Sequence, residues 1–273
     1  MSRIIVVTSG KGGVGKTTCS ANLGMAIAQL GHSVALIDAD FGLRNLDLLL
    51  GLENRIVYTA MEVISGDCRL EQALVKDKRQ PKLALMPAAQ NRTKDAVTTE
   101  QMAELVKDVA KQYDFVLIDC PAGIEMGFKN AVVGAKEAVI VTTPEVAAVR
   151  DADRVIGLLE ANGIKTMRLI INRLRPDMVQ ADRMMSVQDV QEILAIPLLG
   201  VIPDDEQVII STNRGEPLVL SEKISLAGIA FSNIAQRLNG KKVPFLDLTA
   251  AHDDIFSRIR RLFGSGSGNE YRR

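Results

Sequence analysis

Short runs of Val, Ile and Leu recur along the chain, with few polar residues inside them. Runs of this kind are typical of strands that are covered on both faces, as in a parallel sheet. The predicted strands are residues 4–8, 34–38, 83–87, 115–119, 138–142, 168–172 and 198–202. Segments with helical spacing lie between them, at 17–30, 99–111, 147–161 and 186–194. The pattern predicts an α/β fold with a doubly wound, mostly parallel sheet and helices on both faces.

The end of the chain has a different pattern from the rest. A last core helix is expected over 223–238, because Asn239-Gly240 and the following Lys-Lys-Val-Pro form a helix-ending signal. The Gly-Ser-Gly-Ser-Gly run further on has the composition of a flexible segment. The expected organisation is a folded domain at 1–240, a linker at 241–252, an amphipathic helix at 253–263 and a flexible tail at 264–273.

Composition excludes several classes of protein. The 273 residues contain 33 Lys plus Arg and 33 Asp plus Glu, so no global field attracts nucleic acid. Met1-Ser2-Arg3 leads directly into a short strand followed by glycines, which is unlike a signal peptide. No apolar run approaches the roughly 18 residues of a spanning helix. We therefore expect a cytoplasmic protein whose membrane contact, where it has any, is peripheral.

The cysteines and histidines do not indicate a metal or redox centre. Cys19, Cys68 and Cys120 are widely spaced and form no CxxC pair, which argues against a disulfide framework and against a zinc or iron–sulfur site. His32 and His252 are isolated from each other and from any carboxylate cluster. We assign neither histidine a role.

A glycine-rich loop follows the first predicted strand. Gly10-Lys11-Gly12-Gly13-Val14-Gly15-Lys16-Thr17 matches GxxxxGK[ST] and leads directly into a helix. Glycines let backbone N–H groups surround phosphate oxygens, and the helix directs its positive end toward them. Lys16 is expected to bridge the β and γ phosphates of ATP, and Thr17 to contact Mg²⁺. The alternative is a strand-to-helix turn without function.

Lys11 is a second lysine inside this loop, where an ordinary P-loop needs no cation. The string from Lys11 to Thr18 resembles the deviant Walker A motif of the MinD/ParA family of ATPases. By that resemblance, Lys11 reaches across a homodimer to the partner's nucleotide. The alternative is a solvated lysine.

A second motif follows the predicted strand 115–119, which ends at Asp119. A carboxylate at this point suits a Walker B aspartate that holds a water of the Mg²⁺ shell. The next residues, Cys120-Pro121-Ala122-Gly123, resemble switch II of the same family. The resemblance implies that the Gly123 amide senses the γ-phosphate.

The strand 34–38 also ends in acids. Asp38-Ala39-Asp40 precedes a Gly-Leu-Arg-Asn-Leu-Asp run at 42–47 that is similar to switch I of the family. By that resemblance Asp40 positions the attacking water, while Asp38 supports the metal and Asn45 has a supporting role. For Asp38 and Asn45, an N-cap and a polar loop remain the alternative.

The loops that would contact the base are less distinctive. Asn172 and Pro203 lie at the ends of predicted strands, and the family places adenine contacts at corresponding loops. No guanine-reading N-K-x-D occurs where a GTPase would carry it. We expect ATP, not GTP, as the ligand.

The segment 253–263 has the pattern of an interfacial helix. Five apolar residues fall within an arc of roughly 120° at helical spacing, with arginines beside and opposite it. The membrane-contacting residues are expected to be Ile255, Phe256, Arg258, Ile259, Arg260, Arg261, Leu262 and Phe263. The segment resembles the family's membrane-targeting sequence, although the tail after Phe263 is longer than usual. The alternative is a last helix packed on the domain.

The chain is identified as a member of this family by its P-loop, both switches and its C-terminal segment. The resemblance implies an ATP-dependent homodimer on the cytoplasmic face of the inner membrane that positions the cell or plastid division site. The same resemblance implies that this dimer recruits the division inhibitor MinC and is released when MinE stimulates hydrolysis. A ParA-type partition ATPase should instead carry a basic surface for DNA. A metal-cluster carrier or nitrogenase-like reductase would need paired cysteines.

Overall fold

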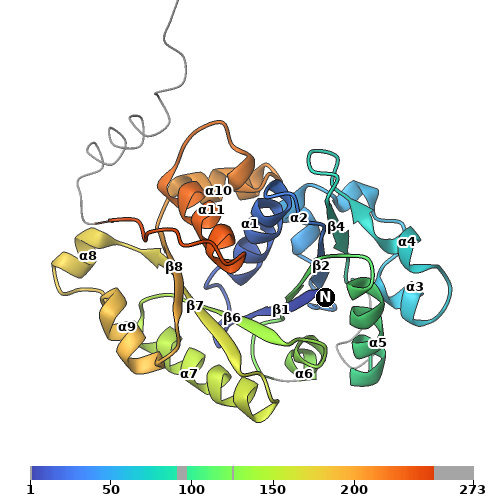
Figure 1. Cartoon of the computed structure of the whole chain (residues 1–273), viewed down its shortest axis with the longest axis horizontal. Coiled ribbons are helices and arrows are strands. Elements are labelled where there is room, and N and C mark those ends of the chain that lie inside the picture. Colours follow the sequence, from blue (N-terminus) through green and yellow to red (C-terminus); the bar gives the residue numbers. More distant parts are fainter. Residues whose placement is uncertain (1, 91–96, 125, 249–273) are drawn as a thin grey trace, which may run out of the picture.

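The structure is a computed structural model that describes residues 2–90, 97–124 and 126–248 (Figure 1). Its strands are β1 (Arg3–Thr8), β2 (Val34–Asp38), β3 (Val75–Lys76), β4 (Leu83–Met86), β5 (Phe115–Asp119), β6 (Glu137–Thr142), β7 (Thr166–Leu174) and β8 (Leu198–Pro203). They form one sheet of eight strands in the order β3-β4-β2-β5-β1-β6-β7-β8. Every neighbouring pair is parallel except β3 and β4. The predicted fold class is confirmed.

Helices cover both faces of this sheet (Figure 1). They are α1 (Lys16–Gln29), α2 (Leu46–Leu50), α3 (Ala60–Ile64), α4 (Leu70–Ala73), α5 (Thr99–Ala110), α6 (Met126–Val132), α7 (Val146–Ala161), α8 (Pro176–Gln180), α9 (Val187–Leu194), α10 (Glu206–Asn213) and α11 (Leu226–Leu238), with short 3-10 turns at Glu53–Arg55 and Leu218–Leu220. None of the described helices is both long and apolar enough to cross a bilayer.

Two apolar layers hold the helices on the sheet. One layer contains Leu23 of α1 and Phe231 of α11, and the other contains Met102 of α5 and Val155 of α7. All five residues of β5 are buried, because helices cover the strand on both sides. This burial explains the continuous apolar runs in the sequence.

The register of the central strands places two acids together. Asp119 at the end of β5 is the register partner of Asp38 at the end of β2, and of Val7, the last residue but one of β1. The P-loop leaves β1 at the same edge of the sheet. Ligands of open α/β sheets bind at this edge, outside the carboxyl ends of the strands.

Some predicted boundaries were wrong. The last core helix begins at Leu226 and not at 223, because the Ser225 hydroxyl caps it by accepting the Gly228 N–H at 3.1 Å. Strand β3 and its antiparallel pairing with the predicted strand β4 were missed, as were the short helices α2, α3, α4, α6, α8 and α10. These elements are too short to show a clear hydrophobic period.

The chain continues beyond α11 along the surface of the domain. The Arg237 guanidinium donates to the carbonyls of Val243 and Pro244, and it lies 4.2 Å from the centroid of the Phe245 ring. Residues 249–273 lie outside the described part of the structure. They include the predicted amphipathic helix at 253–263 and the predicted tail at 264–273.

Candidate active site

The glycine-rich loop joins β1 to α1, which begins at Lys16. Gly15 has φ 93°, a conformation that favours glycine. A Cβ at Gly15 would lie 2.3 Å from Nδ2 of Asn172, and a Cβ at Gly10 would lie 2.1 Å from the carbonyl oxygen of Asp151. The loop can therefore pack against β7 and α7 only with glycines at these two positions.

The predicted base residue Asn172 lies against this loop. It is 7% exposed near the end of β7, and its Nδ2 donates to the carbonyl oxygen of Val14 at 2.7 Å. The next residue, Arg173, has φ 57°. Asn172 thus connects the loop expected to hold the phosphates with the strand end expected to hold the base.

Asp119 is buried beneath the first turn of α1. Its Oδ1 accepts a hydrogen bond from the Ser20 hydroxyl at 2.7 Å, and the Thr17 hydroxyl also bonds to its carboxyl group. Burial raises the pKa of Asp119, while the charge of Lys16 and these hydrogen bonds act in the opposite direction. Ser20 was not predicted, although it lies one helical turn after Lys16, on the face of α1 that meets β5.

Asp38 lies beside Asp119 and is 1% exposed. Burial, reinforced by the neighbouring charge of Asp119, raises the pKa of Asp38 to about 7. Its two oxygens accept the backbone N–H groups of Asp40 at 2.9 Å and Leu46 at 3.3 Å. Asp38 therefore bonds to the first N–H group of α2, although Asn45 is the N-cap residue of that helix, and it also shares a buried site with a second carboxylate.

This pair of acids fits a divalent cation. Two buried carboxylates repel each other, and a cation between or near them relieves that repulsion. The available donors are the hard oxygens of Thr17, Asp38 and Asp119, which suit Mg²⁺. Among residues 2–90, 97–124 and 126–248, no three His, Cys, Asp or Glu side chains converge on one point. Mg²⁺ is commonly held by one or two carboxylates together with substrate phosphates and waters.

The predicted switch I residues lie in the loop that follows β2 and in the start of α2. Asp40 is half-buried, and Asn45 is exposed at the start of α2 with no capping hydrogen bond from its side chain. Arg44, at φ 41°, forms an ion pair with the buried Asp47, with Nε 2.8 Å from Oδ2. Burial raises the pKa of Asp47, and the charge of Arg44 opposes that shift. This ion pair was not predicted.

Switch II lies beside the P-loop. A Cβ at Gly12 would be 3.7 Å from the Cβ of Ala122, so the two loops are within contact distance. Gly123 has φ 92°, a conformation that favours glycine. Gly123 therefore lies in a bend, one residue after the Ala122 that adjoins the predicted phosphate cradle.

Lys11 lies at the surface. Its Nζ is 3.1 Å from Oε2 of Glu145, the residue before α7, and the two side chains are 42% and 58% exposed. An exposed pair of this kind is weak and is easily exchanged. Glu145 was not predicted, because nothing in its sequence context links it to the P-loop.

A cavity of about 300 Å³ adjoins the P-loop on the side of β7 and β8. The lining residues are Gly15, Thr18, Asn172, Arg173, Pro203, Asp204, Asp205, Val208 and Ile209. We call it the base cavity. It brings together both residues predicted to contact the base, Asn172 and Pro203, although they lie on different strands.

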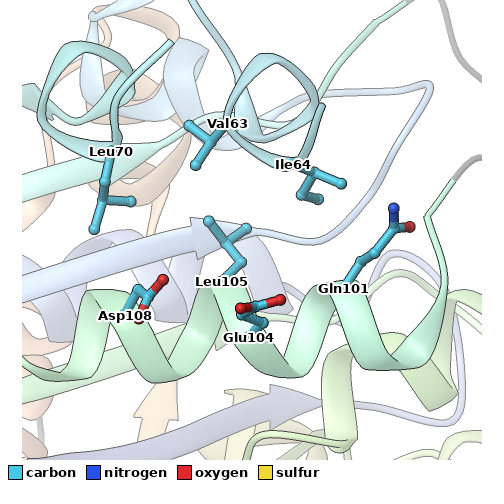
Figure 2. A pocket seen from close by; sticks show the side chains of 7 residues that line it. All are labelled: Val63, Ile64, Leu70, Gln101, Glu104, Leu105 and Asp108. Atoms are coloured by element: carbon cyan, nitrogen blue, oxygen red, sulfur yellow. The ribbon is translucent and has the colours of Figure 1, made fainter. Parts of the chain in front are cut away.

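Another cavity, of about 280 Å³, lies between α3, α4 and α5 (Figure 2). Figure 2 shows Leu105 of α5 facing Val63 and Leu70, with Glu104 and Asp108 on the same helix. None of the predicted site residues lines this cavity. It therefore does not compete with the P-loop as the nucleotide site.

The chain is similar to several known proteins. Residues 1–239 match the model of a protein family described as ParA: NUBPL iron-transfer P-loop NTPase. The septum site-determining protein MinD of Synechocystis sp. is 65% identical over 261 residues, which are 96% of this chain and 98% of that protein.

Two solved structures are also similar. The first is a chain of the MinC:MinD cell division protein complex of Aquifex aeolicus, with a TM-score of 0.84 and 48% identity, covering 90% of this chain and 99% of that one. The second is the septum site-determining protein MinD of Pyrococcus horikoshii complexed with Mg-ADP, with a TM-score of 0.79 and 32% identity, covering 88% and 96%.

Proposed function

The chain belongs to the septum site-determining MinD branch of the ParA family of P-loop NTPases, and on that premise we propose that it hydrolyses ATP as a homodimer. The observation that carries this proposal is the convergence of Lys16, Thr17, Asp38 and Asp119 at one sheet edge, directly beneath the P-loop. That arrangement provides a phosphate cradle beside a cation site. The Mg-ADP complex of the Pyrococcus horikoshii relative supports the same ligand class.

The residues of the site have separable tasks. The backbone N–H groups of the loop and the Lys16 ammonium bind the phosphates, and Asp40 orients the attacking water. Thr17, Asp38 and Asp119 would hold Mg²⁺ and its waters, and the ion would neutralise charge that develops on the phosphate oxygens. We expect the Gly123 amide to respond to the γ-phosphate, because switch II lies beside the P-loop.

The second lysine supports the proposal of a dimer. Among the described residues, the Lys11 ammonium forms an exposed ion pair with Glu145. In the dimer we expect the Lys11 ammonium to exchange this carboxylate for the phosphates of the partner's nucleotide, because the phosphates carry more negative charge than one carboxylate. ATP would then lie between the two chains.

Further partners follow from the family. The Aquifex aeolicus relative is part of a MinC:MinD complex, and we propose that this chain recruits MinC to the cytoplasmic face of the cell membrane. Residues 253–263 would bind anionic headgroups through their arginines and apolar side chains. Release would follow MinE-stimulated hydrolysis. Cycles of this kind would position the division site.

Iron transfer is a poorer candidate function. Of the three cysteines, Cys19 and Cys120 are buried, and burial is the main cause that raises the pKa of each thiol to about 12. A thiol that stays protonated is a poor metal ligand. The septum site-determining relatives therefore describe this chain better than the iron-transfer description does.

Two lysine variants test the proposal. Lys16→Ala should weaken ATP binding at least tenfold, because it removes the charge that faces the β and γ phosphates. Lys11→Ala should still bind ATP, but neither dimerise nor hydrolyse it. Calorimetry, light scattering and phosphate release measure the three properties. Lys111→Ala is the control, since Lys111 pairs with Asp108 on α5. A Lys11→Ala protein that dimerises with ATP would contradict the cross-subunit role.

A further inference from the structure

Each end of helix α2 forms a hydrogen bond with a side chain, and the two side chains belong to different parts of the molecule. At its start, the Leu46 N–H donates to Oδ2 of Asp38, in the predicted metal site. At its end, the Leu50 carbonyl accepts a hydrogen bond from Nη2 of Arg79 at 2.5 Å. The loop that carries Asp40 leads directly into this helix, so the position of α2 affects the position of that carboxylate.

Arg79 holds a second carbonyl with the same guanidinium group. Nη1 donates to the carbonyl oxygen of Gly215 at 3.1 Å, in the loop after α10. Nε and Nη2 meanwhile bond to the two oxygens of Asp77 at 3.1 and 2.7 Å. Asp77 is 1% exposed, so the planar guanidinium is anchored on a buried carboxylate. It therefore connects α2 and the α10 loop in a fixed orientation.

The two connected segments also touch directly. A Cβ at Gly51 would lie 2.7 Å from the carbonyl oxygen of Gly215, and a Cβ at Gly215 would lie 2.8 Å from Cα of Gly51. Both glycines have positive φ, 61° and 63°. Backbone packed this closely has no room to move independently. A shift of the α10 loop must displace either α2 or Arg79.

The other end of α10 belongs to the base cavity. Asp205 caps the helix by accepting the Gln207 N–H at 2.9 Å, and Val208 and Ile209 line the cavity from the first turns. A base in that cavity would restrict α10. The chain of contacts therefore runs from the base cavity through α10, Gly215 and Arg79 to α2.

We propose that Arg79 is a positioning residue for hydrolysis, which transmits occupation of the base cavity to α2 and so to Asp40. This inference rests on the proposed ATPase function. The proposed property is regulatory. A base bound in the base cavity would act through Arg79 on the switch I segment, in addition to contributing to nucleotide binding. If Arg79 had only a structural role, it would stabilise the fold without coupling the base cavity to α2.

Hydrogen exchange of the α2 amides in the full chain separates these roles. AMP is the probe, because it fills the base cavity but has no β or γ phosphate. In the wild-type protein AMP should slow exchange in residues 46–50 severalfold. In Arg79→Gln, AMP should still bind, but this protection should be lost. Arg55→Gln is the matched control, since Arg55 donates to the Lys76 carbonyl on the same hairpin.

Kinetics provides the second measurement. Arg79→Gln should lower kcat about tenfold or more with little change in KM, since it misplaces Asp40 without altering the binding groups. If Arg79→Gln does not fold, Arg79→Lys replaces it, because a lysine keeps the charge near Asp77 but cannot serve both carbonyls. We expect Arg79→Lys to lose the coupling as well.

Two results would overturn the inference. One is bound AMP that leaves α2 unprotected in the wild-type protein, and the other is equal protection in wild type and both Arg79 variants. Neither result bears on the proposed function, which fails only if the wild-type chain does not hydrolyse ATP. The exchange experiment involves no hydrolysis, so the two failures are distinguishable.

Discussion

At the scale of single residues, each acid near the P-loop has a different environment. Asp38 and Asp119 are almost fully buried side by side, whereas Asp40 is only half-buried at the mouth of the site. Buried carboxylates with hydrogen bonds to the backbone or to hydroxyl groups are suited to hold a cation. A carboxylate at the mouth can reach a water molecule. This difference supports separate roles for acids that lie close together.

Asp40→Ala should separate binding from turnover. The substitution leaves the phosphate cradle intact but removes the group that orients water, so ATP binding and dimerisation should persist while hydrolysis falls about 10²-fold or more. Phosphate release in the presence of the stimulating partner measures the change. Asp67→Ala is the control, since Asp67 accepts a hydrogen bond from Ser65 at the surface. A stimulated rate near that of the wild type would mean that another group holds the water.

At the scale of elements, the β3–β4 hairpin depends on one buried ion pair. Burial by itself would raise the pKa of Asp77, but hydrogen bonds and charge from Arg79 outweigh burial and lower that pKa below its ordinary value. A lowered pKa in the folded state stabilises the protein above the unfolded pKa of about 3.9. That contribution is lost as the pH falls through the folded pKa.

Asp77→Asn should therefore be destabilising in a pH-dependent way. At pH 7 we expect a loss of about 1.5–3 kcal/mol in the free energy of unfolding, the range for hydrogen bonds between charged groups. The difference from wild type should shrink below about pH 4, where the wild-type carboxylate also becomes protonated. Urea unfolding between pH 3 and pH 7 measures it. A difference that is constant across this range would mean that the charge of Asp77 contributes nothing.

At the scale of the whole molecule, the number of chains in the complex should control membrane binding. One segment with three arginines, at about 1 kcal/mol each near an anionic surface, should bind weakly and be sensitive to salt. The proposed dimer would present two such segments. The second then binds as an effectively intramolecular event, which raises avidity roughly 10²-fold without a new contact.

Liposome sedimentation tests this switch. With anionic vesicles, the intact chain should bind much better in ATP than in ADP. Truncation before Asp253 should abolish binding, and Ile259→Glu should weaken it by placing a charge within the apolar arc. Equal binding in ADP and ATP would contradict the avidity mechanism. Undiminished binding of the truncated chain would place the anchor elsewhere.

The sequence by itself determined the fold class and the glycine-rich loop that we propose as the phosphate site. Both depend on local signals: continuous apolar strands result from burial on both faces, and the P-loop needs glycines and Lys16 within a few consecutive residues. The strand ends carrying Asp38 and Asp119 were found in the same way. Residues close together in the chain were therefore assigned before their positions in space were known.

Only the tertiary structure decided which distant residues meet. The hydrogen bond from Asn172 to Val14, the pair of Lys11 with Glu145 and the clamp formed by Arg79 join residues more than 25 positions apart. No local hydrophobic period or motif encodes such contacts, because they depend on the spatial order of the strands in the sheet. The physical reason is that an apolar run in the sequence specifies that a strand is buried, but not which strands lie beside it in the sheet. The neighbours are decided by packing of the whole sheet and its helices.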